Sequence, residues 1–176
     1  MNIKTRPFTQ EEFQKLLWVS PEPWRSIFHL AYLTGLRISD LLLLRAGSVP
    51  QRIVITEKKT GNVRNIQVNP SIVTAWNRIS AYSTNEYLFP FRDQSSYRKA
   101  IYRYSATAHI PLDRLAFHSI RKTTATQICN SMGIVAAYQF LGHKRISTTM
   151  KYIEMDALEI GGLLEALQVQ KELDHV

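Results

Sequence analysis

The chain has 176 residues, 45% of them hydrophobic, and this composition excludes an intrinsically disordered polypeptide. Lysine and arginine number 22 against 14 aspartates and glutamates, and the formal charge of +8 favours a polyanionic partner, nucleic acid before membrane. The single cysteine, Cys129, excludes an intrachain disulfide and a cysteine-based zinc site, and no apolar run approaches the roughly 18 residues of a membrane span. These features predict one soluble domain in the cytoplasm.

The N-terminal part of the chain is predicted to be helical. Thr9 and Glu12 form a capping box that starts a first helix. A second helix begins near Pro23, carries apolar residues at helical spacing and ends at Gly35. A third, short helix is expected to pass through residues 41–44.

The hydrophobic period then changes from helical to extended. Residues 52–56 and 63–68 are short, β-branched runs separated by a polar turn that contains glycine, a pattern typical of a β-hairpin. Asn69 and Pro70 follow as the N-cap and first position of another helix.

Helices dominate the rest of the chain, and glycines separate several of them. The predicted helices cover residues 94–108, 118–131, 134–141, a short segment ending near Tyr152, and about 156–170. The sequence therefore predicts a mainly α fold with one small antiparallel β-sheet, of the α+β class.

One window, residues 118–152, contains the groups needed to hold and attack a phosphodiester. It includes His118, Arg121, His143 and Tyr152. Without a metal, fixed cations must meet the negative charge of the transition state, and the planar fork of arginine matches phosphate oxygens. The imidazoles are candidates for proton transfer or phosphate orientation, and the phenol for covalent attack.

Two cations far upstream supply parts that this window lacks. Arg37 follows a glycine turn at a helix start, where backbone N–H groups favour an anion, and Asp40 lies one turn on to orient it. Lys59, at the tip of the predicted hairpin, is placed to protonate a leaving group. Taken singly, each residue is more often an ordinary surface or packing residue, and the prediction depends on their joint occurrence.

Four separated motifs occur in a fixed order along the chain. They are residues 34–41 with Arg37, Lys59-Thr60-Gly61 with Arg64, His118-x-x-Arg121, and Leu141-Gly142-His143 followed by residues 147–149 and Tyr152. Together they resemble the catalytic domain of the tyrosine recombinases, the phage integrase family. The resemblance covers roughly residues 8–155, and the nine-residue step from His143 to Tyr152 matches the usual pattern of that family.

The resemblance implies a site-specific DNA recombinase or integrase that cleaves and rejoins strands and requires neither a metal nor ATP, because a 3′-phosphotyrosyl link conserves the bond energy. The roles that it implies are phosphate clamping by Arg37 and Arg121, protonation of the 5′-hydroxyl by Lys59, proton abstraction by His118, phosphate support by His143 and nucleophilic attack by Tyr152.

The resemblance also implies a partner and an assembly. We expect double-stranded DNA in the cytoplasm of a prokaryote or phage host, with a solution monomer that assembles into a tetramer through the apolar helix at about 156–170. The pattern starts within ten residues of Met1, so residues 1–176 are expected to form a single catalytic domain without the N-terminal core-binding domain usual in the family. Lys122 also departs from the family, which commonly has histidine there.

Two other functions remain compatible with these motifs. One is a catalytically inactive DNA-binding regulator, or a relic, that keeps the fold. The other is a nicking and closing enzyme similar to type IB topoisomerases, which shares the chemistry without the strand exchange.

Overall fold

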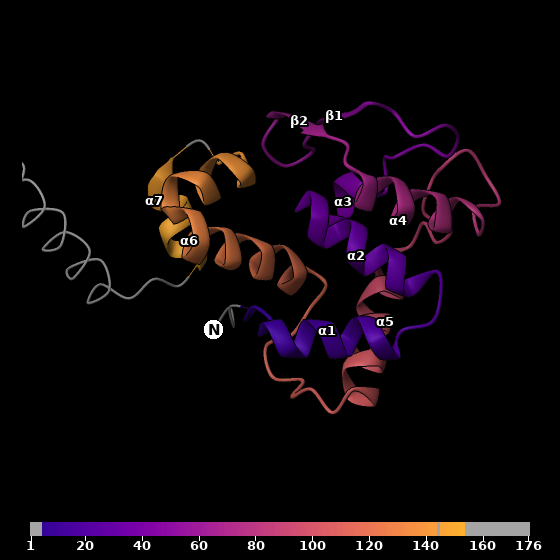
Figure 1. The fold of residues 1–176 in the computed structure, drawn as a ribbon, viewed down its shortest axis with the longest axis horizontal. Coiled ribbons are helices and arrows are strands. Elements are labelled where there is room, and N and C mark those ends of the chain that lie inside the picture. The colour runs from indigo at the N-terminus through magenta and orange to yellow at the C-terminus, as the bar shows by residue number, and fades with distance from the viewer. Residues whose placement is uncertain (1–4, 144, 154–176) are drawn as a thin grey trace, which may run out of the picture.

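A computed structural model describes residues 5–143 and 145–153 of the chain. The described elements are α1 Gln10–Val19, α2 Trp24–Thr34, α3 Ile38–Leu41, β1 Arg52–Thr56, β2 Val63–Gln67, α4 Pro70–Ser80, α5 Gln94–Thr107, α6 His118–Leu141 and α7 Ile146–Ile153 (Figure 1). The two strands pair antiparallel. This confirms the predicted fold class of a mainly helical domain with one small sheet.

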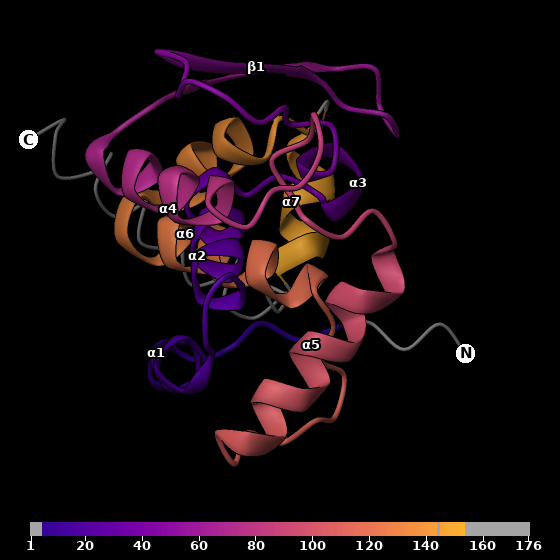
Figure 2. The same cartoon turned by 90° about the vertical axis from the view of Figure 1, so that its right-hand side faces the viewer.

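Helix α2 runs through the middle of the fold and packs against α1, α4 and α6. The hairpin of β1 and β2 lies at one end of the molecule, α1 and α5 lie together at the other, and α6 and α7 form a third side (Figures 1 and 2). None of the helices in the described ranges is both long and apolar enough to cross a membrane. The helix predicted at 156–170 lies outside the described residues.

Local sequence signals set most of the helix ends. The Thr9 hydroxyl accepts a hydrogen bond from the Glu12 backbone N–H at 3.1 Å, and the Glu12 carboxylate accepts one from the Thr9 N–H at 2.9 Å. The Asn69 side chain caps α4 by accepting a hydrogen bond from the Ile72 backbone N–H. Gly35 and Gly142 end α2 and α6 in the left-handed conformation, which glycine adopts without steric cost.

Two helix predictions need correction or refinement. Helix α3 stops at Leu41 instead of continuing through Leu44. The Leu44 carbonyl accepts a hydrogen bond from the Leu88 N–H at 2.8 Å. This long-range pairing favours an extended backbone at Leu44 over continuation of the helix. The helices predicted at 118–131 and 134–141 are joined as α6, with Gly133 at φ 83° and ψ 170° as the predicted break between them.

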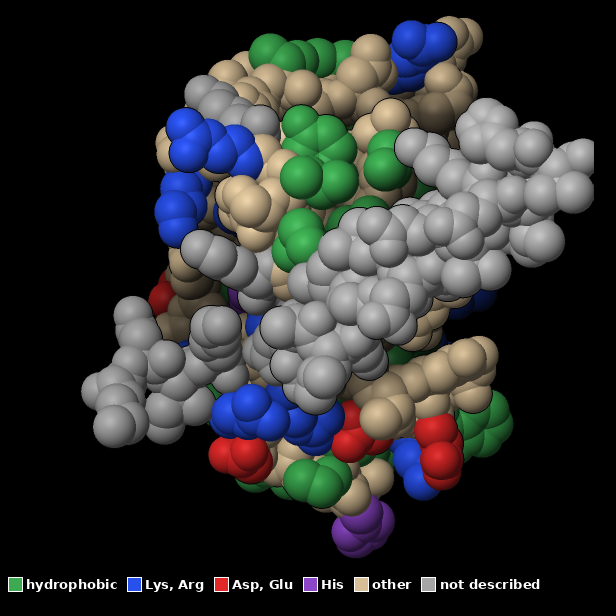
Figure 3. Space-filling model, turned by 90° about the vertical axis from the view of Figure 1, so that its left-hand side faces the viewer, with side chains coloured by type: hydrophobic (Ala, Val, Ile, Leu, Met, Phe, Trp, Pro, Cys, Tyr) green, Lys and Arg blue, Asp and Glu red, His purple; other side chains and the backbone are tan. Residues whose placement is uncertain are grey.

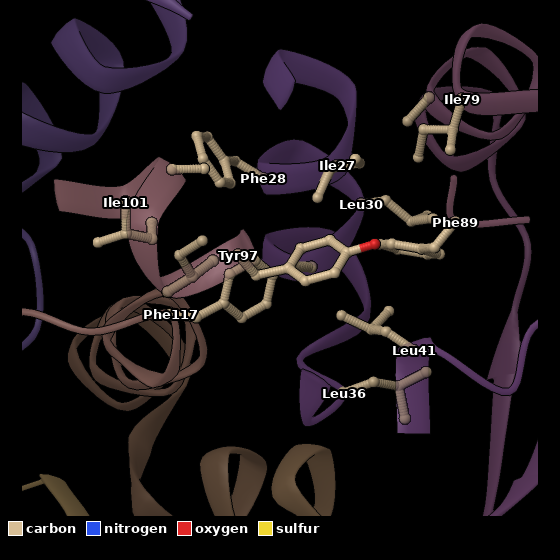
Figure 4. Close-up of a cluster of buried hydrophobic side chains, with 14 of the residues drawn as sticks. Ile27, Phe28, Leu30, Leu36, Leu41, Ile79, Phe89, Tyr97, Ile101 and Phe117 are labelled. Atoms are coloured by element: carbon tan, nitrogen blue, oxygen red, sulfur yellow. The ribbon is translucent and has the colours of Figure 1, made fainter. Parts of the chain in front are cut away.

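The hydrophobic core lies between α2, α4 and α5 and includes the loop before α6 (Figure 4). Tyr97 lies at its centre, with its ring edge-on to Trp24 and Phe117 at centroid distances of 5.6 and 5.7 Å. Its hydroxyl donates a hydrogen bond to the Phe91 carbonyl at 2.6 Å, which satisfies the buried polar group. In the basic, tyrosine-rich segment of α5, Tyr97 is therefore a core residue.

The hairpin presents one face to the rest of the protein. Ile53 and Ile55 of β1 are buried, whereas Val54 between them is exposed. Alternation continues past the strand end, so Glu57 also faces inward, and Arg64 faces the same way because it pairs with Ile55. The inward face thus changes from apolar to charged toward the turn.

Candidate active site

A cavity of about 250 Å³ lies where the α2–α3 turn, the hairpin turn and the first residues of α5 and α6 meet. Its polar lining includes four residues predicted from separate sequence motifs, Arg37, Lys59, His118 and Arg121. Gln94, the first residue of α5, lines it as well. The fold therefore brings together side chains that are up to 84 positions apart in the sequence (Arg37 to Arg121).

Arg37 occupies the N-cap position of α3, and its side chain is largely buried. Its Nη1 lies 2.7 Å from Glu57 Oε2 and 3.9 Å from Asp40 Oδ2. Asp40 is buried, and its Oδ1 accepts a hydrogen bond from the Lys58 backbone N–H at 3.0 Å. Asp40 thus pairs with Arg37 as predicted, but Glu57 is the nearer carboxylate, and Asp40 also fastens the hairpin to α3.

Arg121 lies in the first turns of α6, with only 2% of its surface exposed. Its Nη1 donates to the Gly35 carbonyl, and its Nη2 donates to the Leu141 carbonyl at 2.8 Å. Both acceptors are backbone groups at the C-terminal ends of helices, where the helix dipole favours a cation. The guanidinium is therefore fixed in orientation before any ligand binds.

Glu57 is a site residue that the sequence analysis missed. It is 1% exposed, and its carboxylate lies within ion-pair distance of three guanidiniums, those of Arg37, Arg64 and Arg121. Burial by itself raises the pKa of this carboxyl, but hydrogen bonds from Thr60 and Arg37 together with the arginine charges outweigh it and lower the pKa. The inward alternation of Ile53, Ile55 and Glu57 was the signal available in the sequence.

Arg64 was part of a recognised motif without a role, and it proves to be buried at the base of the site. Its Nη1 donates to the Leu141 carbonyl at 3.2 Å and its Nη2 to the Thr34 carbonyl at 3.3 Å. The guanidinium also lies over the Phe140 ring, 5.6 Å from the centroid. Burial, and then the charge of Arg121, lower the pKa of Arg64 to about 10, so it stays positively charged at pH 7.

The two predicted histidines are neutral at pH 7. Burial, followed by the positive charges of Arg121 and Arg37, lowers the pKa of His118 to about 4. The same causes lower the pKa of His143 to about 4. Nδ1 of His143 lies 2.9 Å from the hydroxyl of Thr149, which is fully buried. Thr149 is a second residue whose contact was not predicted.

Helix α7 packs against α6 and carries both Thr149 and Tyr152. Tyr152 follows Thr149 by three residues, which is close to one helical turn. The side chain of Tyr152 lies outside the described part of the structure.

Among residues 5–143 and 145–153, no three histidine, cysteine, aspartate or glutamate side chains are grouped so that they could hold a metal ion. The described site gathers three guanidiniums, of which those of Arg64 and Arg121 are buried and that of Arg37 is largely buried, together with two neutral imidazoles and a lysine. Fixed guanidiniums are suited to a phosphate group and to charge that develops on its oxygens. The arrangement of these side chains is therefore chemically suited to holding a phosphodiester.

The comparisons with known proteins agree with this chemistry. The family model of the phage integrase family matches residues 6–159. Tyrosine recombinase XerC of Xanthomonas campestris pv. campestris (strain B100) is 27% identical over 158 residues, which cover 81% of this chain and 47% of that protein.

Two solved structures have the same fold. A lambda integrase dimer bound to a COC′ core site superposes with a TM-score of 0.73 at 18% identity, covering 87% of this chain and 49% of that one. A lambda integrase tetramer bound to a Holliday junction gives a TM-score of 0.71 at 18% identity, covering 86% and 49%.

The chain belongs to the phage integrase family, the family of the tyrosine-type site-specific recombinases. It spans about half the length of the curated relatives that it matches.

Proposed function

We propose that this protein is a site-specific DNA recombinase that cleaves and rejoins DNA strands through a 3′-phosphotyrosyl intermediate. The observation that carries the proposal is the convergence of Arg37, Lys59, His118 and Arg121 on one cavity, with Tyr152 on the helix that also carries Thr149, the partner of His143. No ATP is consumed, because the energy of the phosphodiester is kept in the tyrosyl ester. The guanidiniums supply the charge stabilisation that a metal ion would otherwise provide.

The reaction follows from the charges of the site. The guanidiniums of Arg37 and Arg121 bind the non-bridging oxygens of the scissile phosphate and stabilise the charge of the transition state. The phenolic oxygen of Tyr152 forms a bond to phosphorus while the bond from phosphorus to the 5′-oxygen breaks. Lys59 gives its proton to the departing 5′-oxygen, and the attack of another strand's 5′-hydroxyl reverses the step.

Neutral imidazoles suit this chemistry. His118 borders the cavity, and with a pKa of about 4 it is unprotonated at pH 7 and able to accept the tyrosine proton. His143 donates a hydrogen bond to a phosphate oxygen through the ring nitrogen that does not face Thr149. A protonated imidazole would be unable to act as the base.

We further propose that a solution monomer assembles into a tetramer on double-stranded DNA. The side of the molecule that carries α6 and α7 exposes hydrophobic side chains next to lysines and arginines (Figure 3). Met132, Val135 and Ile146 are exposed on these two helices. Exposed apolar groups of this kind favour a protein contact.

A suicide-substrate experiment tests the reaction. The 176-residue chain is incubated with a pool of nicked duplexes whose central sequence is randomised, and covalent protein–DNA adducts are isolated on denaturing gels and sequenced. We expect one recurrent sequence, attached through Tyr152. Tyr152→Phe should abolish the adduct, whereas the matched control Tyr82→Phe, at an exposed position on the loop after α4, should form it normally.

The remaining variants and outcomes separate the alternatives. Arg37→Ala or Arg121→Ala should slow adduct formation by roughly two to three orders of magnitude, the scale expected when a charge stabiliser is removed. Sequence-selective DNA binding without any adduct would favour an inactive regulator. Relaxation of a supercoiled plasmid without sequence preference would favour a topoisomerase-like enzyme.

A further inference from the structure

We infer that Glu57 is a positioning residue for strand cleavage: its buried carboxylate holds the guanidiniums of Arg37 and Arg121 together and ties them to the turn that carries Lys59. This inference rests on the proposed function, since it assigns those three side chains to the reaction. Glu57 itself is not part of the cavity lining and acts through its neighbours.

The first argument is electrostatic. Arg37 and Arg121 line one cavity, and Arg64 adds a third positive charge directly behind them. Like charges at this spacing repel, more strongly when water is excluded. Glu57 Oε2 lies 2.7 Å from Arg37 Nη1, and Glu57 Oε1 lies 3.6 Å from both Arg121 Nη1 and Arg64 Nη1. One carboxylate therefore offsets the mutual repulsion of all three groups.

The second argument concerns the hairpin turn. The Glu57 N–H donates to the Asn62 carbonyl, and the Gly61 N–H donates to the Glu57 carbonyl, both at 2.9 Å. The Thr60 hydroxyl donates to Glu57 Oε2 at 2.6 Å. Glu57 thus closes the turn around Lys59 with its backbone while its side chain holds the arginines.

The turn is also fixed at its far end. The Asn62 side-chain amide donates to the Gly142 carbonyl at 2.8 Å, directly before His143. Lys59 is exposed and extends from a turn whose base is fastened on both sides. Neutralising Glu57 removes none of the backbone hydrogen bonds of the turn, but it would release the contact between this turn and the two arginines.

The test compares two substitutions at this position with a matched control. Glu57→Gln keeps the length and the acceptor for Thr60 but removes the charge, and Glu57→Asp keeps the charge but withdraws it by one methylene. Glu86→Gln, in the exposed ion pair with Arg45, is the control. Single-turnover cleavage is measured at saturating concentrations of a duplex recovered from the covalent-adduct selection, and the dissociation constant of the same duplex is measured separately.

We expect Glu57→Gln to slow cleavage roughly 10- to 100-fold with less than about a twofold change in the dissociation constant, the scale found for groups that orient a reactive partner. Glu57→Asp should recover part of the rate, and Glu86→Gln should cleave at the wild-type rate. The inference would be overturned if folded Glu57→Gln cleaved at the wild-type rate. If Glu57→Gln does not fold, cleavage by Glu57→Asp at the wild-type rate would overturn it instead. A slower rate explained entirely by weaker DNA binding would overturn it as well.

A second readout does not depend on cleavage. Guanidinium N–H signals of Arg37 and Arg121 in the free protein should be sharp in the wild type and should broaden in Glu57→Gln, because the counter-charge that restrains their rotation is removed. Unchanged signals would contradict the positioning role. If the wild-type protein forms no adduct at all, the proposed function fails, and these signals still decide whether Glu57 positions the arginines.

Discussion

Two residues of this site keep different charges at pH 7 in the same electrostatic environment. Burial and neighbouring guanidiniums lower the pKa of Arg64 to about 10 and the pKa of His118 to about 4. An arginine shifted in this way remains a cation at pH 7, whereas a histidine loses its proton. The same field therefore yields fixed positive charges and a neutral imidazole side by side.

A pH prediction follows for His118 and His143. Their pKa values of about 4 in the folded state lie below the ordinary value of 6.5, so the unfolded chain binds more protons between those values. The stability should fall as the pH drops from about 6.5 to 4, and His118 should contribute more to this loss than the less buried His143. Denaturant unfolding at stepped pH measures the slope.

The matched variants identify which groups cause that slope. Replacing His118 and His143 by glutamine should reduce it, and His109→Gln, at an exposed position, is the matched control. Imidazole NMR signals assigned to His118 or His143 that titrate near pH 6.5 in the folded protein would contradict the prediction.

The hydroxyl of Thr149 is expected to orient His143. Thr149→Val keeps the shape of this buried side chain and removes the 2.9 Å contact with Nδ1, whereas Thr149→Ser keeps the hydroxyl. We expect Thr149→Val to slow single-turnover cleavage about tenfold, the lower end of the effects of orienting groups, and Thr149→Ser to cleave nearly normally. Equal rates for the two variants would exclude an orienting role.

At the level of elements, the end of α2 is closely fitted to α6. Gly35 has φ +58°, and a Cβ atom built there would overlap the Phe140 ring of α6. Gly35→Ala should lower the unfolding free energy by about 2 kcal/mol or more, because it combines left-handed strain with steric overlap. Gly61→Ala is the matched control, since φ is +68° but nothing lies within 4 Å, and it should cost only about 1 kcal/mol.

A second substitution separates the two contributions. Phe140→Leu in the Gly35→Ala background should recover part of the stability, because it removes the overlapping ring atoms. Equal destabilisation by Gly35→Ala and Gly61→Ala in urea unfolding would show that the packing between α2 and α6 contributes nothing.

Elements governed by neighbouring residues were predictable from the sequence. The capping box at Thr9, the cap at Asn69 and the glycine at 133 involve contacts within a few positions, and the pairs of the hairpin span at most 15 positions. The end of α3 was predicted wrongly because the pairing of Leu44 with Leu88 spans 44 positions. Local propensity carries no information on such a contact.

The site was predictable to a similar degree. Motif order indicated Arg37, Lys59, His118 and Arg121, and the structure brings these four together in one cavity. The central position of Glu57 was not predicted, because its three arginine partners come from three different elements or turns. Alternation along β1 shows that Glu57 faces inward, but it does not show what Glu57 meets there.

At the scale of the whole molecule, the formal charge of +8 bears on DNA affinity. Lys99 and Arg103 are exposed one turn apart on α5, whose first residue Gln94 lines the cavity. We expect DNA binding to weaken with salt. Lys99→Gln with Arg103→Gln should reduce the slope of log affinity against log salt by about 0.9 for each phosphate that the variant no longer neutralises.

Fluorescence anisotropy with a labelled duplex at several salt concentrations measures this slope. Lys15→Gln, at an exposed position on α1, is the control and should not change it. If the double variant on α5 showed the wild-type slope, α5 would not be part of the DNA-binding surface.

The backbone acceptors of the buried arginines affect how the protein tolerates mutation. Arg64 and Arg121 donate to the carbonyls of Thr34, Gly35 and Leu141, which every amino acid possesses. Side-chain replacement deletes the donor of such a pair but never the acceptor. In a saturation-mutagenesis library, the arginines should therefore be intolerant positions, while Leu141 should accept other apolar residues. Mutagenesis therefore detects the arginine donors of this network but not its backbone acceptors, which only the structure shows.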